Sequence, residues 1–289
     1  MAARAMRDEE SSRRAADWNE RDLLEQYARD LSAVYDSERK RRQELQSALQ
    51  QMEQFASDLK DTYSSLRDAH QKLLSAYLDT LYRLALAAEY RDQEFGGHIL
   101  RISSYSALLA EKLGWAAEEV HKLRLASPMH DVGKIGIPDN ILLKPGILTS
   151  GEFELMKTHT TIGAAILEGA ESEIMRIGRE IALTHHERWD GTGYPEGLQG
   201  ESIPLRGRIV GLADVWDAYT SKRHYKSGSS TEKALELIRR ERGRHFDPDM
   251  VDIFVANIDE VVRIKRESER GSTEARDIFS WNGEKGRAV

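Results

Sequence analysis

His130 and Asp131 place an imidazole and a carboxylate on adjacent residues at the end of an apolar run, and Lys134 follows three positions later. Adjacent side chains on a helix or strand point in different directions. These two can therefore act together only at the mouth of an element or through a metal ion that binds both. Nitrogen and oxygen ligands suit divalent ions such as iron, manganese or zinc. A His-Asp pair also occurs by chance as a surface dipeptide, so its meaning depends on the rest of the chain.

Other histidines and carboxylates fall at expected helix ends and loop mouths. The histidines are His98, His130, His159, His185 and His186, and the carboxylates are Glu94, Asp131 and Asp214. Taken singly, His159 fits an exposed helix residue. Asp214 lies inside an apolar helix, where a buried carboxylate without a partner costs several kcal/mol. Separate structural roles for all of these residues would leave several unpaired polar groups in apolar helices, so a shared site is the better interpretation.

The elements that must position these side chains are helices. Apolar residues recur at helical spacing, and no strand-like alternation of any length occurs, so the predicted fold class is all-α. We expect helices at 78–90, 98–113, 116–129, 150–168, 173–187, 205–220, 231–242 and 247–264, with glycine-bearing loops at 91–97, 135–150 and 188–204. The first helix is apolar nearly all round, which predicts a buried helix. Pro128 should tighten the last turn before His130.

Residues 21–77 carry a heptad pattern in one register, with apolar residues at most a and d positions. Neither glycine nor proline interrupts it, because the first glycine is Gly96 and the first proline is Pro128. A single helix cannot bury such a stripe against itself, so we expect a parallel coiled coil that forms a homodimer. Glu38 and Arg42 put charge into the seam. Two interpretations follow: a plain dimerisation helix, or a signalling helix whose weak layers let it change its packing.

Composition limits the class of protein. The chain has 289 residues, 40% of them hydrophobic and 31% charged, with a net charge of −7 and no cysteine. The lack of cysteine excludes disulfides, thiolate metal ligands and a cysteine nucleophile, and it is compatible with a cytoplasmic location. No apolar run approaches the roughly 18 residues of a membrane-spanning helix. The acidic balance argues against a nucleic acid polymer as partner. We expect residues 1–20 to form a flexible charged lead-in and residues 265–289 a loosely ordered polar tail.

Four stretches between residues 78 and 264 carry a more specific signal. They read HDVGKIGIPDNILLKPGILTSGEFELMKTH, HHERWDGTGYPEGLQGESIP, ADVWDAYTSKRHYK and HFDP. Together they resemble the HD-GYP domain, a branch of the HD phosphohydrolase superfamily, and their length, order and spacing make the match highly specific. The resemblance implies a helical bundle that holds two or three divalent ions, usually iron or manganese. It also implies hydrolysis of cyclic di-GMP to pGpG and, in many members, on to GMP.

The resemblance implies roles for individual residues. The implied metal ligands are Glu94, His98, His130, Asp131, His159, His185, His186 and Asp214. Among these, Asp131 is implied to bridge two ions, and Glu94 and His98 match an element of members that hold a third. The residues implied to hold the substrate phosphates are Lys134, Arg223 and Lys226. The signature Gly193-Tyr194-Pro195 lies in the loop over the ligand, and His224 stands where the family usually has proline.

The chemistry implied by these residues is attack on a phosphodiester, whose anionic oxygens repel nucleophiles unless their charge is neutralised. The histidines would bind as neutral imidazoles, oriented by partners that include Asp190 or Asp217. Lys134 and Arg223 would face the negative charge that grows on the phosphoryl group. Either Lys134 or a metal-bound water would protonate the leaving 3′ oxygen, and the residues do not distinguish the two.

Alternatives stay open at this point. The leading hypothesis is a metal-dependent cyclic di-GMP phosphodiesterase. A second is a non-catalytic module that binds the nucleotide or a protein partner and passes a signal through the coil. A third is a hydrolase of another cyclic dinucleotide, because the ligand set would be the same. A regulatory partner would dock on residues 1–77. Tyr194 would contact the ligand, or its loop would recruit a protein. Residues expected to pack or to be exposed are Trp189, Trp216, His70, His121 and His245.

Overall fold

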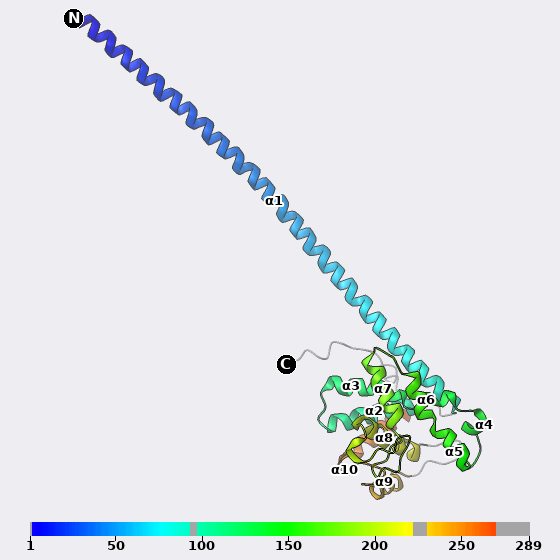
Figure 1. The fold of residues 1–289 in the computed structure, drawn as a ribbon. Helices are drawn as coiled ribbons and strands as arrows, with labels where there is room; N and C mark the ends of the chain where they lie inside the picture. Colours follow the sequence, from blue (N-terminus) through cyan, green and yellow to red (C-terminus); the bar gives the residue numbers. More distant parts are fainter. Residues whose placement is uncertain (1, 93–96, 222–229, 270–289) are drawn as a thin grey trace. The chain divides into compact units, whose positions relative to one another are not determined.

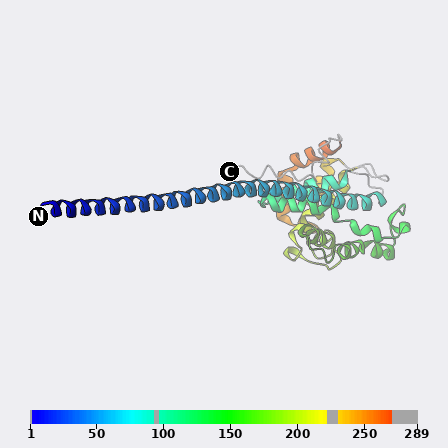
Figure 2. The ribbon, with the colours of Figure 1, turned by 90° about the horizontal axis from the view of Figure 1, so that it is seen from above.

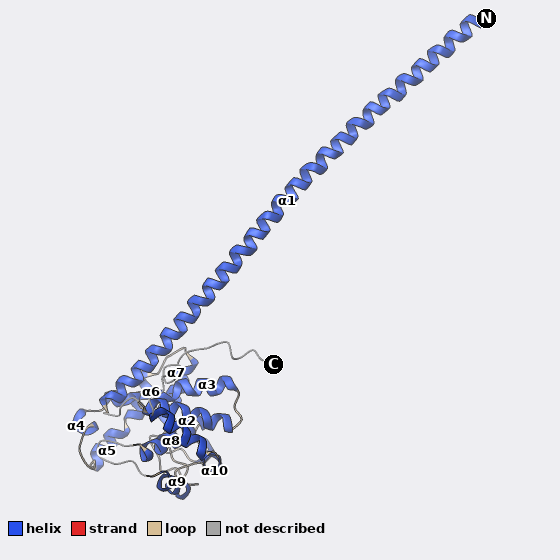
Figure 3. Cartoon of the chain, turned by 180° about the vertical axis from the view of Figure 1, so that it is seen from behind, coloured by secondary structure: helices blue, strands red, loops and turns tan. Residues whose placement is uncertain are grey.

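The computed structural model of the protein describes residues 2–92, 97–221 and 230–269, with side chains from residue 20 to residue 268 of these ranges. Within them every regular element is a helix, and backbone bridges occur only as two isolated pairs (Figure 3). This confirms the all-α fold class. The chain divides into two compact units, residues 1–70 and 71–289. None of the described helices combines the length and apolarity needed to cross a bilayer.

Helix α1 spans Ala2–Arg91 without a break (Figures 1 and 2). Its residues 2–20 are helical, in a stretch that no glycine or proline interrupts. In the first unit every described side chain from residue 20 to residue 70 is exposed. The apolar residues of the predicted seam are among them, including Leu31, Leu45 and Leu59.

The last turns of α1, from residue 71 onward, belong to the second unit. Its buried side chains there are Leu78, Leu81, Ala85, Ala88 and Glu89. These residues recur at intervals of three and four, so they form one stripe along the helix. Leu84 and Tyr90 lie off that stripe and remain 38% and 59% exposed. The prediction of a helix buried all round is therefore wrong, because only one face of this segment meets the bundle.

The remaining helices form the second unit. Their bounds are α2 His98–Lys112, α3 Ala117–Ala126, α4 Asp139–Leu142, α5 Ser150–Lys157, α6 His159–Ile166, α7 Glu173–Thr184, α8 Leu205–Thr220, α9 Thr231–Arg240, α10 Pro248–Ala256 and α11 Ile258–Glu269, with 3₁₀ turns η1 Ser127–Met129, η2 Val132–Gly136 and η3 Gly200–Ser202. Helix α2 packs against α3 and α8, and α7 packs against α3, α6 and α8. Their shared core includes the fully buried Tyr105, Ile181 and Trp216.

Three element predictions need correction. The helix expected at 150–168 is two helices that meet at Thr158, and the one expected at 247–264 is two that meet at Asn257. At both joints a side chain bonds a carbonyl of the preceding turn: Thr158 Oγ1 donates to Leu155 O at 2.6 Å and Asn257 Nδ2 to Ile253 O at 2.8 Å. Such bonds compete with the helical backbone pattern. The short helix α4 lies inside the loop predicted at 135–150.

Glycines at two helix crossings bring the site elements close together. A Cβ atom on Gly133 would clash with the backbone carbonyl of His159 and with the backbone of Gly163, so η2 lies directly on α6. A Cβ on Gly211 would meet the carbonyl oxygen of His185 at 2.5 Å, so α8 lies directly on the end of α7. Both approaches need a residue without a side chain, and each holds a site histidine at the crossing.

Candidate metal centre

Four predicted ligands converge in one cluster: Asp131, His159, His185 and His186 offer ligand atoms within 4.8 Å of one another. Asp131 lies between η1 and η2, His159 opens α6, and the two adjacent histidines follow α7. His159 Nε2 lies 3.3 Å from Asp131 Oδ1, and His185 Nε2 lies 3.6 Å from the same oxygen. The cluster therefore assembles from three helix ends around one carboxylate.

A second cluster lies beside the first and consists of His98, His130 and Asp214. His98 begins α2, His130 follows η1, and Asp214 lies within α8. His98 Nε2 lies 3.7 Å from Asp214 Oδ1, and His130 Nε2 lies 3.2 Å from the second carboxylate oxygen of Asp131. Asp131 thus presents one oxygen to each cluster, which is the geometry that a carboxylate between two ions requires.

Backbone carbonyls orient most of these rings. The Nδ1–H groups donate to carbonyl oxygens one turn earlier: His130 to Ser127 O at 3.0 Å, His159 to Met156 O at 2.7 Å and His185 to Ile181 O at 3.0 Å. Because these acceptors are carbonyls, they fix Nδ1 as the protonated nitrogen and leave Nε2 as a ligand atom. A histidine just after a helix can reach the orphan carbonyls in the last turn of that helix, which explains the local pattern.

His98 is oriented by a carboxylate instead. Asp217 Oδ2 accepts from His98 Nδ1 at 2.8 Å, and Arg101 donates to both oxygens of the same carboxylate at 2.6 and 2.8 Å. Arg101 and His98 hold the pKa of Asp217 below its ordinary value, although burial alone would raise it. The predicted orienting role of Asp217 is confirmed. The alternative, Asp190, is wrong: it accepts from the Thr192 backbone N at 3.0 Å within its own loop.

The donor atoms fit a divalent cation. Nε2 of His130, His159 and His185 and Oδ1 of Asp131 are buried without a hydrogen bond, and such groups are costly unless something binds them. Nitrogen and carboxylate oxygen are the ligands expected for iron, manganese or zinc. The described residues thus include two clusters that could each hold a metal ion.

Protonation states agree with this fit. Burial lowers the pKa of His159 to about 4 and holds that of His186 well below its ordinary value, so both rings are neutral ligands at pH 7. Burial raises the pKa of Asp131, but Lys134 and His130 outweigh that effect and hold it well below its ordinary value. Burial also lowers the pKa of His130, yet the Asp131 carboxylate outweighs it and raises that pKa, because a buried carboxylate attracts positive charge.

Two predicted substrate residues lie beside the clusters. Lys134 Nζ lies 2.8 Å from Asp131 Oδ2. The Tyr194 ring lies 4.8 Å from the ring of His186, its backbone N donates to His186 O at 3.3 Å, and Lys157 Nζ lies 5.5 Å from its ring centre. Burial raises the pKa of the Tyr194 hydroxyl, which stays protonated at neutral pH. Outside the described residues are Glu94, Arg223, His224 and Lys226.

Sequence reasoning did not single out Glu187, which follows the adjacent histidines. Its buried carboxylate accepts from the backbone N–H groups of Glu196, Gly197 and Leu198 at 2.8, 3.1 and 2.9 Å. Gly193 passes so close that a Cβ there would meet Glu187 Cα at 2.6 Å. A signal was present, because a loop dense in glycine leaves backbone N–H groups that need acceptors. Glu187 therefore holds the loop that carries Tyr194.

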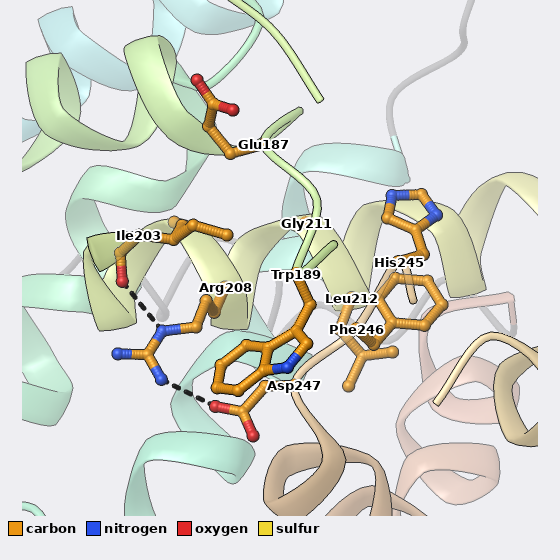
Figure 4. Close-up of a pocket in the computed structure, with 10 residues that line it drawn as sticks. Glu187, Trp189, Ile203, Arg208, Gly211, Leu212, His245, Phe246 and Asp247 are labelled. Atoms are coloured by element: carbon orange, nitrogen blue, oxygen red, sulfur yellow. Dashed lines mark hydrogen bonds and ion pairs between the residues drawn. The ribbon is translucent and has the colours of Figure 1, made fainter. Parts of the chain in front are cut away.

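A pocket beside the candidate metal centre is lined by Trp189, Arg208 and His245 among other residues (Figure 4). Its polar groups pair with one another: Arg208 donates to Ile203 O at 2.9 Å and to Asp247 Oδ2 at 2.7 Å, and it lies over the Trp189 ring. His245 stacks on Phe246 with the ring centres 4.3 Å apart. These contacts are structural, as predicted for Trp189 and His245. Trp216, fully buried against Phe254, also packs as predicted.

Fold and site together define an all-α protein with a candidate metal centre of histidine and aspartate ligands at helix ends. Residues 80–250 match the HD domain family, which is more than half of the 289 residues. The chain belongs to the HD domain family, and the resemblance stated from the motifs is confirmed.

Known relatives fall in the same family. The chain is 44% identical over 209 residues to a cyclic di-GMP phosphodiesterase of Thermotoga maritima, covering 71% of this chain and 57% of the relative. It is 43% identical over 187 residues to a 3′3′-cGAMP-specific phosphodiesterase of Vibrio cholerae, a match that covers 65% of this chain and 36% of the relative. A solved cyclic GMP-AMP-specific phosphodiesterase of V. cholerae shares the fold, with a TM-score of 0.51 at 21% identity over 70% of this chain and 52% of that one. The chain thus spans about half the length of such relatives, or less.

Proposed function

We propose that the chain is a metal-dependent phosphodiesterase that hydrolyses cyclic di-GMP to pGpG and on to GMP. The observation that carries the proposal is the position of Asp131, whose two oxygens face two histidine clusters in which Nε2 of His130, His159 and His185 makes no hydrogen bond. Support also comes from the relative named a cyclic di-GMP phosphodiesterase. The proposed first step adds one water across one phosphodiester bond of the ring to give pGpG, and a second water across the remaining phosphodiester bond gives two GMP.

The proposed cofactor is two or three divalent ions, iron or manganese. The proposed ligands of one ion are Asp131, His159, His185 and His186, those of the next are His98, His130, Asp131 and Asp214, and Glu94 would serve a third. When bound, such ions supply hydroxide at neutral pH and neutralise phosphate charge. The contribution of the chain is to keep the rings neutral and oriented, through the carbonyl contacts of three histidines and the contact of His98 with Asp217.

On the substrate side, Lys134 is the proposed residue beside the scissile phosphate. Its ammonium group lies 2.8 Å from the carboxylate that faces both clusters, so it can face the charge that grows on the phosphoryl oxygens. The proton for the leaving 3′ oxygen is proposed to come from Lys134 or from a bound water. Arg223 and Lys226 are proposed to bind the phosphates, because guanidinium and ammonium groups suit that contact. Tyr194 is proposed to line the nucleotide site, since its ring stacks against His186.

A second candidate substrate is a mixed cyclic dinucleotide. The relative of V. cholerae that is named for 3′3′-cGAMP favours this possibility. The proposed metal ligands would serve either substrate, because both contain the same phosphodiester linkage. Assays with the two nucleotides at equal concentration separate the candidates by their kcat/KM ratio.

The proposal includes an assembly and a location. Residues 21–77 are proposed to form a homodimeric coiled coil, since their apolar side chains are exposed along α1. A regulatory protein is proposed to act on residues 1–77. We propose a cytoplasmic location because the substrate is a messenger within bacterial cells. Domain bounds of 21–77 for the coil and 78–264 for the catalytic part complete this proposal.

The test is anaerobic purification with metal quantification, followed by a product assay. Asp131→Asn should lose most of the bound metal and lower hydrolysis by about 100-fold or more, since the bridging ligand is removed. Asp68→Asn is the matched control, because this aspartate is exposed on α1 at an outward f position of the heptad. Full hydrolysis by Asp131→Asn would refute the mechanism. Nucleotide binding by the wild-type protein without turnover in any metal would favour a binding module instead.

A further inference from the structure

Arg91, the last residue of α1, is bound to the segment that carries Lys134. Its guanidinium donates to the backbone carbonyl oxygens of Lys134 at 3.1 Å, of Ile135 and of Ile137 at 2.7 Å, and to the Asp139 carboxylate at 2.9 Å. The side chain is 30% exposed, so these contacts lie in a partly desolvated place. One arginine thus contacts the chain from Lys134 in η2 to Asp139 at the start of α4.

The chemistry of the turn explains why an arginine stands here. A 3₁₀ turn of five residues leaves carbonyl oxygens without helical partners. A guanidinium presents five N–H donors in a fixed plane, which can serve several carbonyls at once. The opposite side of the turn is fixed by Gly133, which lies against the backbone of Gly163 in α6. Turn η2 is therefore held between α6 and the end of α1.

The next residue makes a contact with the lysine itself. Asp92 Oδ2 lies 2.5 Å from Lys134 Nζ, while Asp131 Oδ2 lies 2.8 Å from it. One carboxylate thus comes from the end of α1 and the other from the candidate metal centre. A pocket of about 270 Å³ lies between these two parts. Ala85, Glu89 and Asp92 line it from the end of α1, and His98, His130 and Lys134 line it from the candidate metal centre.

We propose that Arg91 is a positioning residue: it fixes turn η2 so that Lys134 stands beside Asp131, and it thereby couples the last turn of α1 to the candidate active site. Any change that rotates or unwinds this last turn withdraws the guanidinium from three carbonyls and releases the backbone of Lys134. The inference rests on the proposed function for the role of Lys134. It adds that α1 regulates the site through this contact.

The experiment follows Lys134 directly. In the full-length, metal-loaded protein, the rate at which an amine-reactive acylating reagent modifies Lys134 is measured by mass spectrometry. Arg91→Gln should raise this rate about tenfold. Loss of one charge-assisted hydrogen bond shifts the opening equilibrium of turn η2 by about that factor, and only the open turn exposes Lys134 to the reagent. With cyclic di-GMP, kcat should fall by a similar factor while KM and metal content change less than about threefold. Arg91→Lys keeps the charge and loses the planar fork. Its Lys134 labelling rate and its kcat should lie between those of the wild type and of Arg91→Gln.

Arg83→Gln is the matched control, because Arg83 is exposed on the same helix and pairs only with Asp79 among the described contacts. It should leave Lys134 labelling, kcat and KM unchanged. Equal labelling in Arg91→Gln and Arg83→Gln would overturn the proposal, whether or not the protein hydrolyses the nucleotide. Labelling that rises in a protein without hydrolysis would support the positioning role and refute the proposed function alone. If Arg91→Gln does not fold, the labelling of Arg91→Lys decides, and a rate equal to wild type overturns the proposal.

Discussion

Glu187 is a single buried carboxylate that orders a loop without regular structure. It accepts three backbone N–H groups between residues 196 and 198, and the loop carries Tyr194 back onto His186. A carboxylate with two oxygens can accept all three bonds, whereas an amide offers only one acceptor oxygen. The position therefore requires an acid rather than a polar side chain of the same size.

Glu187→Gln tests this requirement. The variant turns one acceptor into a donor that faces the N–H of Leu198, and a buried donor without an acceptor costs about 1–3 kcal/mol. We expect the free energy of unfolding to fall by that amount in urea denaturation. Glu196→Gln, an exposed change in the same loop, should shift it by less than about 0.5 kcal/mol. Equal stability of the two variants would contradict the role assigned to Glu187.

At the residue scale, the sequence motifs predicted which side chains are candidate metal ligands. All described candidate ligands, from His98 to Asp214, converge in the two clusters. Residue type marks each of them in the sequence, and all but Asp214, which lies within α8, also stand at helix ends. Arg91 and Glu187 escaped prediction because their partners are backbone carbonyl and N–H groups. No residue type at the partner position encodes such a contact, so only the fold reveals it.

At the scale of elements, the crossing of η2 and α6 fixes Asp131 relative to His159. The two backbones touch at Gly133 and Gly163, so the carboxylate and the imidazole start from adjacent points. The sequence predicted helices over 205–220 and 98–113 closely, because their apolar spacing is regular and Gly114 ends the second with a φ of 80°. It could not predict the breaks at Thr158 and Asn257, where a side-chain hydrogen bond outweighs continued helical periodicity.

Gly133→Ala tests the crossing. The added methyl group would clash with backbone atoms of α6, which cannot rotate away as a side chain can, so we expect a loss of about 3 kcal/mol in unfolding free energy. Asp131 would shift with η2, and bound metal should fall with it. Gly151→Ala is the control, since nothing lies within 4 Å of a Cβ there, and a helical glycine replaced by alanine gains up to about 1 kcal/mol. Unchanged metal content and stability in Gly133→Ala would contradict the assigned close approach.

At the scale of the whole molecule, the first unit is a helix without a packing partner among the described residues. Leu31, Leu45 and Leu59 are 72%, 63% and 71% exposed, and they recur at multiples of seven. An exposed apolar stripe on a helix marks an interaction surface, and here Glu38 interrupts it between Leu31 and Leu45. A helix with this repeat buries its stripe most simply against a second copy of itself, since the same residues then meet at each layer.

The double variant Leu45→Glu with Leu59→Glu tests the dimer. Two charges in the seam should dissociate it, so light scattering should report twice 32.8 kDa for the wild type and 32.8 kDa for the variant at micromolar concentration. Gln43→Glu with Gln50→Glu adds the same charge at two outward b positions of the heptad and should stay dimeric. A wild-type mass of 32.8 kDa would refute the coiled coil. Because α1 ends at Arg91, the kcat of the dissociated variant also separates the two roles proposed for α1, dimerisation alone or signalling. An unchanged kcat identifies a plain dimerisation helix. A changed kcat with unchanged metal content identifies a signalling helix.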